Sequence, residues 1–334
     1  MIHNKKIAIT MGDPAGIGAE IIVKSLAALN PNPENIVLVG NRELFAMAGL
    51  PEAYDIIDVP CNVLDIKIGR FNSESGKTSF LALEKACELV KENKIQAIVT
   101  APLSKKAINL AGYDYSGQTE IIEKYLGSED NKAEMLFVAD DFRVLLLTRH
   151  IALKEIPGLL TGDKIIESIL SLNYALVNRF KIKKPRFAIC GLNPHSGEDG
   201  LIGTEESEII IPAINELVKK YNIHIEGPFP ADTIWLRAAK AVFGKTHQPY
   251  DAYIACYHDQ GLIPVKLLAM EKAVNVTINL PVIRTSPAHG TAFDIAGKGI
   301  ADSGSMKHAI ELAFGLIELS TCYPENFSSG LNLS

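Results

Sequence analysis

Residues 6–20 read KIAITMGDPAGIGAE, a short run of apolar and β-branched residues followed by a glycine-rich turn. Residues 19–29 continue as an apolar segment with the length of a short helix. The stretch therefore predicts a strand, a tight turn and a helix in immediate succession. A chain that repeats this order is typical of α/β proteins, in which helices cover both faces of a largely parallel sheet.

The same order recurs along the whole chain. Short, almost continuously apolar runs predict further strands, as expected where a strand is covered on both faces. They lie at residues 35–39 (NIVLV), 96–100 (QAIVT), 143–148 (RVLLLT), 186–190 (RFAIC), 252–256 (AYIAC) and 274–278 (VNVTI). Helical patterns at residues 78–92, 205–221 and 304–317 lie between or after them. The sequence therefore predicts an α/β fold, and its 334 residues predict about two domains.

The amino-acid composition limits which binding partners and which cellular compartment we expect for this protein. The formal net charge is −6, which argues against a nucleic-acid-binding or anionic-membrane-binding protein. The five cysteines are scattered and form no CxxC pair, which fits a reducing cytosol. The first apolar run is too short for a secretory signal, and no run of 18 apolar residues predicts a membrane span. We therefore expect a cytoplasmic protein with small-molecule substrates.

Polar residues come directly after several predicted strands. In an open α/β sheet, ligands bind at the carboxyl ends of the strands, so these residues are candidates for a binding site. His150, His195 and His258 each come just after a different strand. Three imidazoles suit a divalent metal that keeps open positions for a substrate. The alternative is that each histidine is a hydrogen-bonded loop residue.

Two glycine-rich segments are further candidates. Residues 12–18 (GDPAGIG) fit either a phosphate-binding turn at a helix start or a tight turn that needs glycine, and they are not the G-x-G-x-x-G motif of a Rossmann domain. Residues 289–299 (HGTAFDIAGKG) allow close backbone approach to a flat ligand, with Asp294 as a hydrogen-bond acceptor. Lys266 and Arg284 are the cations that could bind an anionic substrate near the third histidine.

The motifs together resemble the 4-hydroxythreonine-4-phosphate dehydrogenase family over nearly the whole chain. They are MGDPAGIGAEI, APLSKKA, GLNPHSGEDGLIGTEE, GPFPADTIW, YHDQGLIPVK and VNVTINLPVIRTSPAHGTAFDIAGKGIAD, in this order between residues 6 and 313. The last motif is also similar to the NAD-binding loop of isopropylmalate and isocitrate dehydrogenases. The resemblance implies two α/β/α domains around a central cleft. Residues 1–130 with 275–334 would form the cofactor-side domain, and residues 131–274 the metal-binding and dimerisation domain.

The resemblance also implies roles for individual residues. His150, His195 and His258 would bind a divalent metal (zinc, magnesium, manganese or cobalt), with His258 reaching across from the second subunit of a homodimer. Lys266 and Asp232 would be catalytic. The substrate-binding residues would be Gln118, Thr119, Lys266, Asn275 and Arg284, and the residues that bind NAD or NADP would be His289, Gly290, Thr291, Asp294 and Gly297. The implied reaction oxidises 4-hydroxy-L-threonine 4-phosphate and releases CO2, giving 3-amino-2-oxopropyl phosphate for pyridoxal phosphate biosynthesis.

One residue departs from the family pattern. The family has GHTE where this chain has Gly117, Gln118, Thr119 and Glu120, and glutamine cannot carry the charge that a histidine can. The sequence therefore leaves open a D-threonate or D-erythronate 4-phosphate dehydrogenase. A phosphate acyltransferase of related fold, or a protein that binds phosphorylated metabolites without catalysis, would not need three strand-end histidines.

Overall fold

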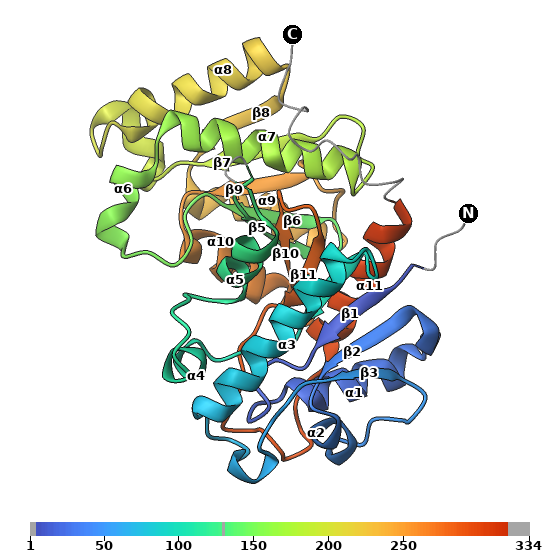
Figure 1. Ribbon diagram of the computed structural model, residues 1–334. Helices are drawn as coiled ribbons and strands as arrows, with labels where there is room; N and C mark the ends of the chain where they lie inside the picture. The colour runs from blue at the N-terminus through green and yellow to red at the C-terminus, as the bar shows by residue number, and fades with distance from the viewer. Residues whose placement is uncertain (1–4, 129–130, 320–334) are drawn as a thin grey trace. The chain divides into compact units, whose positions relative to one another are not determined.

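The computed structural model describes residues 5–128 and 131–319 (Figure 1). These residues fall into two compact units. Glu134–Ala273 forms one, which we call the inserted unit, and the other described residues form the terminal unit. Among the described residues, no helix has the length and apolar character needed to span a membrane.

The terminal unit is built on a mostly parallel sheet. Its strands, in spatial order, are β3 (Asp55–Asp58), β2 (Ile36–Gly40), β1 (Ile7–Thr10), β4 (Ala97–Thr100), β11 (Ile283–Pro287) and β10 (Val274–Ile278). Neighbouring strands run parallel except β10, which is antiparallel to β11. The apolar runs of β1, β2 and β4 are wholly buried, as strands covered on both faces should be.

Helices cover both faces of this sheet. They are α1 (Gly18–Leu29), α2 (Arg42–Met47), α3 (Ser73–Lys91), α4 (Lys105–Leu110), α5 (Gln118–Leu126) and α11 (Gly304–Leu319). Ala8 and Ile98 pack with α3 in one apolar core, whereas Thr285 donates a hydrogen bond to the Ala309 carbonyl of α11 at 2.8 Å. Because successive side chains of a strand point to opposite faces, α3 and α11 lie on opposite sides of the sheet.

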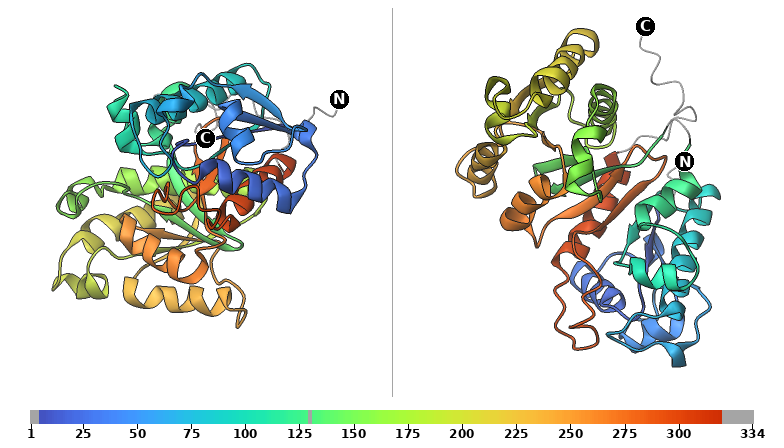
Figure 2. Two further views of the ribbon diagram at one scale, coloured as in Figure 1. Left: turned by 90° about the horizontal axis from the view of Figure 1, so that it is seen from below. Right: turned by 90° about the vertical axis from the view of Figure 1, so that its left-hand side faces the viewer.

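The strands of the inserted unit have the order β5 (Glu134–Ala139), β6 (Phe142–Leu146), β9 (Ala252–Ala255), β7 (Arg186–Cys190) and β8 (His224–Phe229). β5 and β6 form an antiparallel hairpin, and the other pairs are parallel. Its helices are α6 (Ile156–Leu159), α7 (Gly162–Asn178), α8 (Ile211–Tyr221), α9 (Ala231–Val242) and α10 (His258–Ala269). The views of Figure 2 show α9 beside α10, in agreement with their contacts.

The α/β class predicted from the sequence is confirmed, and each of the seven apolar runs contains a strand. The predicted helix at residues 78–92 begins five residues earlier, at Ser73, where the Asn72 side chain caps it. The helix predicted over residues 205–221 begins with a wider π-turn at Glu206–Ile210 before α8.

Candidate functional site

Backbone atoms of the protein itself occupy the space beside the glycine-rich turn that follows β1. A Cβ on Gly12, whose φ is +73°, would lie 2.3 Å from the Pro102 carbonyl oxygen. The Asp13 amide donates to that same oxygen at 2.8 Å. Of the two roles considered for this turn, these contacts favour a tight turn that needs glycine.

A buried guanidinium is the main electrostatic feature of the terminal unit. Arg284 on β11 is 3% exposed, and its hydrogen bonds go to neutral oxygens. The Thr100 hydroxyl accepts from Nε at 3.1 Å and from Nη2 at 2.7 Å, and the Thr277 hydroxyl accepts from Nη1 at 3.2 Å. Burial lowers the pKa of Arg284 to about 10, and the Glu120 charge opposes this shift, so the side chain stays cationic at neutral pH. A buried cation with neutral partners favours an anionic ligand.

Gln118 completes the surroundings of this cation, which with Thr100, Thr277 and Arg284 we call the arginine site. Its Oε1 accepts from Arg284 Nη2 at 3.0 Å, and its Nε2 donates to the Ala101 carbonyl at 2.9 Å. Gln118 is the first residue of α5, whose N-cap Gly117 supplies no side-chain acceptor. The positive end of a helix therefore lies at a buried cation, and both favour an anion.

Two more predicted substrate residues belong to the terminal unit. Thr119 is buried in the first turn of α5. Asn275 on β10 is paired with Ser286 of β11, two residues from Arg284. The Asn275 Oδ1 atom is buried without a hydrogen-bond partner in the structure, which is the condition of a group that a ligand would satisfy.

The structure brings two of the three histidines together, and strand pairing explains why. The Thr148 hydroxyl and amide both donate to the Cys256 carbonyl, at 2.6 and 3.2 Å, so the pairing of β6 with β9 continues past the strand ends. His150 and His258 each come two residues later, and their ring centroids are 5.4 Å apart. We call these two residues the histidine pair.

The histidine pair has the chemistry of a divalent-metal site. His258 Nδ1 lies 2.6 Å from Asp259 Oδ1, an arrangement that fixes the tautomer and leaves Nε2 for a metal. Two imidazoles, one of them oriented by a carboxylate, fit a metal such as zinc. Within residues 5–128 and 131–319, no three His, Cys, Asp or Glu side chains are grouped to hold a metal.

His195 lies on a turn of unusual backbone conformation. The five residues 195–199 all have positive φ, with His195 at +54°. The buried Glu206 stabilises the start of this turn. Its carboxylate accepts hydrogen bonds from the Asn193 backbone amide at 2.7 Å and from the Asn193 Nδ2 atom at 3.0 Å. Gln260 links this region to the histidine pair, because it accepts from the Cys256 amide at 2.7 Å and donates to the Gly191 carbonyl at 2.8 Å.

The two predicted catalytic residues are exposed in the inserted unit. Lys266 follows His258 by eight residues on α10, about 12 Å along the helix axis, and lines a groove with Asp140, His247 and Met270. Asp232 lies in the first turn of α9, which packs beside the turn that carries His195. Within one chain, Lys266 is therefore at the opposite end of α10 from His258.

Residues 289–299 form an open loop supported from one side. The Ile17 amide donates to the Thr291 carbonyl at 3.1 Å, and the Phe71 and Phe293 rings have centroids 5.6 Å apart. Asp294 is exposed, and space is open around Gly290 and Gly299. His289 Nε2 is buried with no partner in the structure. An unpartnered ring nitrogen beside open glycines fits a flat nucleotide with polar edges.

The sequence prediction missed several residues that hold these groups in place. Thr100 and Thr277 position Arg284, Glu206 supports the His195 turn, and Asp259 orients His258. Thr100 has a visible signal, because it is the polar last residue of an apolar strand. Glu206 has none, because it lies in an acidic segment that looks solvent-exposed in the sequence.

Comparisons with known proteins agree on one family. The family model described as pyridoxal phosphate biosynthetic protein PdxA matches residues 10–313. A 4-hydroxythreonine-4-phosphate dehydrogenase from Nostoc is 42% identical, with 94% of each chain covered. A Salmonella typhi relative provisionally named D-threonate 4-phosphate dehydrogenase is 38% identical, covering 94% of this chain and all of that one. The structure of a 4-hydroxythreonine-4-phosphate dehydrogenase from Klebsiella pneumoniae matches with a TM-score of 0.80 and 36% identity, over 94% of this chain and 98% of that one.

Proposed function

The chain belongs to the pyridoxal phosphate biosynthetic protein PdxA family, and on that basis we propose that it is an NAD(P)-dependent, metal-requiring dehydrogenase of 4-hydroxy-L-threonine 4-phosphate. The reaction would oxidise the 3-hydroxyl, on the carbon between the amino-bearing carbon and the phosphate-bearing carbon, to a ketone, and the resulting β-keto acid would release its carboxylate as CO2. The product would be 3-amino-2-oxopropyl phosphate, a precursor in pyridoxal phosphate biosynthesis. The observation that carries the proposal is the buried Arg284 at the N-terminus of α5.

The arginine site would bind the anionic part of the substrate. Four N–H bonds of Arg284 are used by Thr100, Thr277 and Gln118, which fixes the plane of the guanidinium before the substrate arrives. A fixed guanidinium loses little freedom on binding, so its charge and its one remaining N–H act on the substrate with little reorganisation. Thr119 and Asn275 would supply neutral hydrogen bonds beside it.

The histidine pair would hold a divalent metal, with Asp259 orienting His258. Such a metal would lower the pKa of the substrate hydroxyl and stabilise negative charge on the adjacent oxygen. The ligand set would be completed between two subunits of a cytoplasmic homodimer. The metal could be zinc, magnesium, manganese or cobalt, because histidine and water ligands accept each of them.

The open loop of residues 289–299 would bind the nicotinamide cofactor through His289, Gly290, Thr291, Asp294 and Gly297. The nicotinamide would accept the hydride, and the protein would contribute binding and orientation. Lys266 and Asp232 would take up the hydroxyl proton and later return a proton to the carbon from which CO2 leaves. Because both are exposed in a single chain, we infer that they act in the assembled dimer.

Gln118 leaves room for two alternative substrates within the same chemistry. D-threonate and D-erythronate 4-phosphates carry a hydroxyl where 4-hydroxythreonine phosphate carries an amino group. A neutral glutamine amide can hydrogen-bond to either group and carries no charge that would distinguish between them. The provisionally named D-threonate relative supports keeping the D-threonate alternative. A phosphate acyltransferase is disfavoured, since that reaction would not use the histidine pair.

Product analysis tests the proposal. Purified protein with 4-hydroxy-L-threonine 4-phosphate, NAD+ or NADP+ and a divalent metal should form NAD(P)H and CO2 in equal amounts. Chelation should stop both, and added metal should restore both. Formation of NAD(P)H without CO2 would contradict the decarboxylation, and failure to form either product from any of the three phosphorylated acids would overturn the function.

A further inference from the structure

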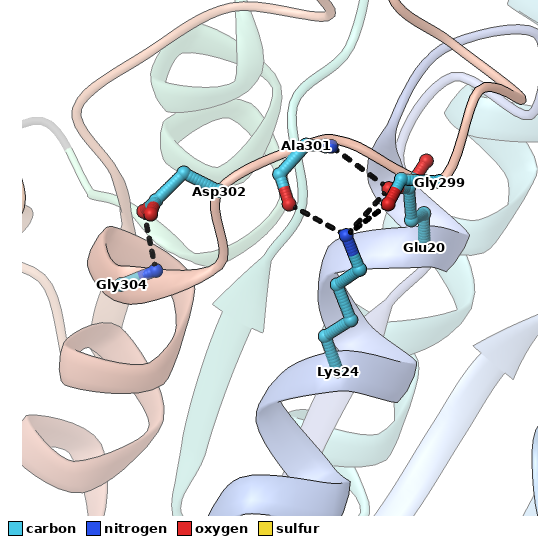
Figure 3. Close-up of polar contacts among 6 residues, drawn as sticks. All are labelled: Glu20, Lys24, Gly299, Ala301, Asp302 and Gly304. Atoms are coloured by element: carbon cyan, nitrogen blue, oxygen red, sulfur yellow. Dashed lines mark hydrogen bonds and ion pairs between the residues drawn. The ribbon is translucent and has the colours of Figure 1, made fainter.

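Two charged residues of α1 hold the far end of the open loop (Figure 3). Lys24 Nζ donates to the Gly299 carbonyl at 2.9 Å, to the Ala301 carbonyl at 2.8 Å and to Glu20 Oε1 at 2.8 Å. Glu20 Oε1 also accepts from the Ala301 amide at 2.9 Å. We call Glu20 and Lys24, with these contacts, the α1 clasp. It joins segments more than 270 residues apart in the sequence.

The number of donors decides what Lys24 can do. An ammonium group has three N–H bonds, and the three acceptors of the α1 clasp use all of them. A lysine beside a nucleotide-binding loop would ordinarily be a candidate for binding a phosphate directly. Lys24 instead has its hydrogen-bonding capacity committed to the loop backbone, so it acts through the loop.

The α1 clasp fastens the end of the loop to α1, just after a turn in which the Lys298 amide donates to the Ile295 carbonyl at 3.2 Å. Gly297 and Gly299 have φ of +73° and +70°, and residues 297–300 are exposed. Beyond the α1 clasp the chain becomes regular, since Asp302 Oδ1 accepts from the Gly304 amide at 2.8 Å where α11 begins. The clasp therefore lies at the point where a glycine-rich, open backbone meets a rigid helix (Figure 3).

A second pair in this protein shows what an ordinary ion pair looks like. Glu216 and Lys220 on α8 have the same i, i+4 spacing and an N–O distance of 3.0 Å. Their side chains are 43% and 63% exposed, against 17% for Glu20 and 37% for Lys24. Exposed pairs of this kind contribute little. The α1 clasp differs because it is more buried and accounts for three hydrogen bonds to loop backbone atoms.

We propose that Glu20 and Lys24 are positioning residues for the nicotinamide cofactor: they fix residues 297–301 so that the loop is already shaped when the cofactor binds. The inference rests on the proposed function, because it takes the loop as the cofactor site. A loop fixed in advance loses less conformational entropy on binding, so the clasp raises cofactor affinity without touching the cofactor. Since it acts through the loop alone, it should leave the chemical step unchanged.

Direct cofactor binding to the full-length protein tests this inference. The dissociation constant for NADH, and then NADPH, is measured by fluorescence for the unchanged protein and for Lys24→Met, with Lys220→Met as the matched control. Lys24→Met should weaken binding about tenfold, Lys24→Arg should recover part of that loss, and Lys220→Met should bind as the unchanged protein does. In kinetics, KM for the cofactor should rise while kcat at saturating cofactor stays within about twofold.

Hydrogen exchange provides a readout that does not depend on cofactor. Amides of residues 297–301 should exchange faster in Lys24→Met, with exchange in β1 and β4 unchanged. Equal NADH affinity in Lys24→Met and the unchanged protein would overturn the inference while leaving the function intact, as would an equal loss in Lys220→Met. Failure of the unchanged protein to bind either cofactor would overturn the proposed function, and the inference with it.

Discussion

Arg284 Nη2 donates a hydrogen bond to Gln118 Oε1 at 3.0 Å, and Gln118 in turn donates to the Ala101 carbonyl. The glutamine thus bridges a buried cation and the backbone at the end of β4. Because a side-chain amide does not titrate, the arginine site keeps one charge state through the neutral pH range. This hydrogen bond distinguishes the chain from family members that have GHTE at residues 117–120, in which a histidine imidazole would occupy the place of the Gln118 amide.

A carboxylate in place of this amide should weaken substrate binding. In Gln118→Glu the new anion would pair with Arg284 and face the Ala101 carbonyl, so the site would no longer favour an anion. We expect KM for the phosphorylated substrate to rise about tenfold or more, with KM for the cofactor unchanged. Steady-state kinetics measures both constants. An unchanged substrate KM would show that the substrate does not use Arg284.

A histidine at this position should introduce a pH dependence. In Gln118→His, the KM for the substrate should differ between pH values below and above the pKa of the imidazole, which is about 6.5 for an ordinary histidine. The unchanged protein measured in parallel should lack this change. The comparison consists of two profiles of kcat/KM against pH with the same substrate and metal. Identical profiles would mean that residue 118 does not contact the bound substrate.

Removal of the charge on Asp259 should weaken metal binding. Asp259→Asn leaves His258 in place but loses the carboxylate at 2.6 Å, and loss of such an orienting group costs about 10- to 100-fold in metal affinity. Chelator competition measures the dissociation constant. Asp163→Asn, in the first turn of α7, is the matched control and should bind metal normally. Equal affinity in the two variants would remove Asp259 from the metal site.

Mixtures of inactive histidine variants should reveal which ligands come from one subunit. His150 and His258 have rings 5.4 Å apart in a single chain, so His150→Ala mixed with His258→Ala should regain no activity. His195→Ala mixed with either should regain about a quarter of the normal activity, through hybrid dimers with one intact site. Activity from the first mixture would instead place His258 across the interface, as the family resemblance implies.

The buried Asp13 should give the stability of the protein a distinctive pH dependence. Burial raises the pKa of Asp13 from 3.8 to about 6, against the opposing hydrogen bonds from Ala15 and Ser75. Between these values the folded state holds a proton that the unfolded chain releases, so this residue's contribution to stability falls as pH rises from about 4 to 6. Asp13→Asn should remove a penalty of at most about 3 kcal/mol at neutral pH.

Urea unfolding of both proteins at a series of pH values checks this prediction. The stability of Asp13→Asn relative to the unchanged protein should grow as pH rises through the interval and be constant above it. A difference that does not vary with pH would mean that Asp13 titrates normally in the folded state.

Most of the continuous apolar strands could be predicted from the sequence because burial on both faces leaves a long apolar pattern, although β5, which is also wholly buried, was missed. The structure adds β3, whose sequence is Asp-Ile-Ile-Asp, and β8, which is largely exposed. Both lie at the ends of their strand orders, where one edge is unpaired and polar residues are tolerated. β11 was missed for a different reason. Its Arg284, Thr285 and Ser286 are polar yet buried; Arg284 belongs to the arginine site, and Thr285 donates a hydrogen bond to α11.

The candidate site residues could be identified one by one, but their grouping could not. Strand-end position marks His150, His195 and His258 equally, and only the hydrogen bonds of Thr148 to Cys256 show which two come together. Likewise, no local pattern places residue 118 beside residue 284. That proximity depends on the β4–β11 pairing and on where α5 begins. Long-range contacts of this kind have no signature in sequence periodicity.

The most direct test of the account compares kcat/KM for 4-hydroxy-L-threonine 4-phosphate with that for D-threonate and D-erythronate 4-phosphates, under one metal and one cofactor, by the rate of NAD(P)H formation. We expect the hydroxythreonine compound to be turned over with the highest kcat/KM. Efficient turnover of either sugar-acid phosphate, with none of the hydroxythreonine compound, would contradict the proposed substrate.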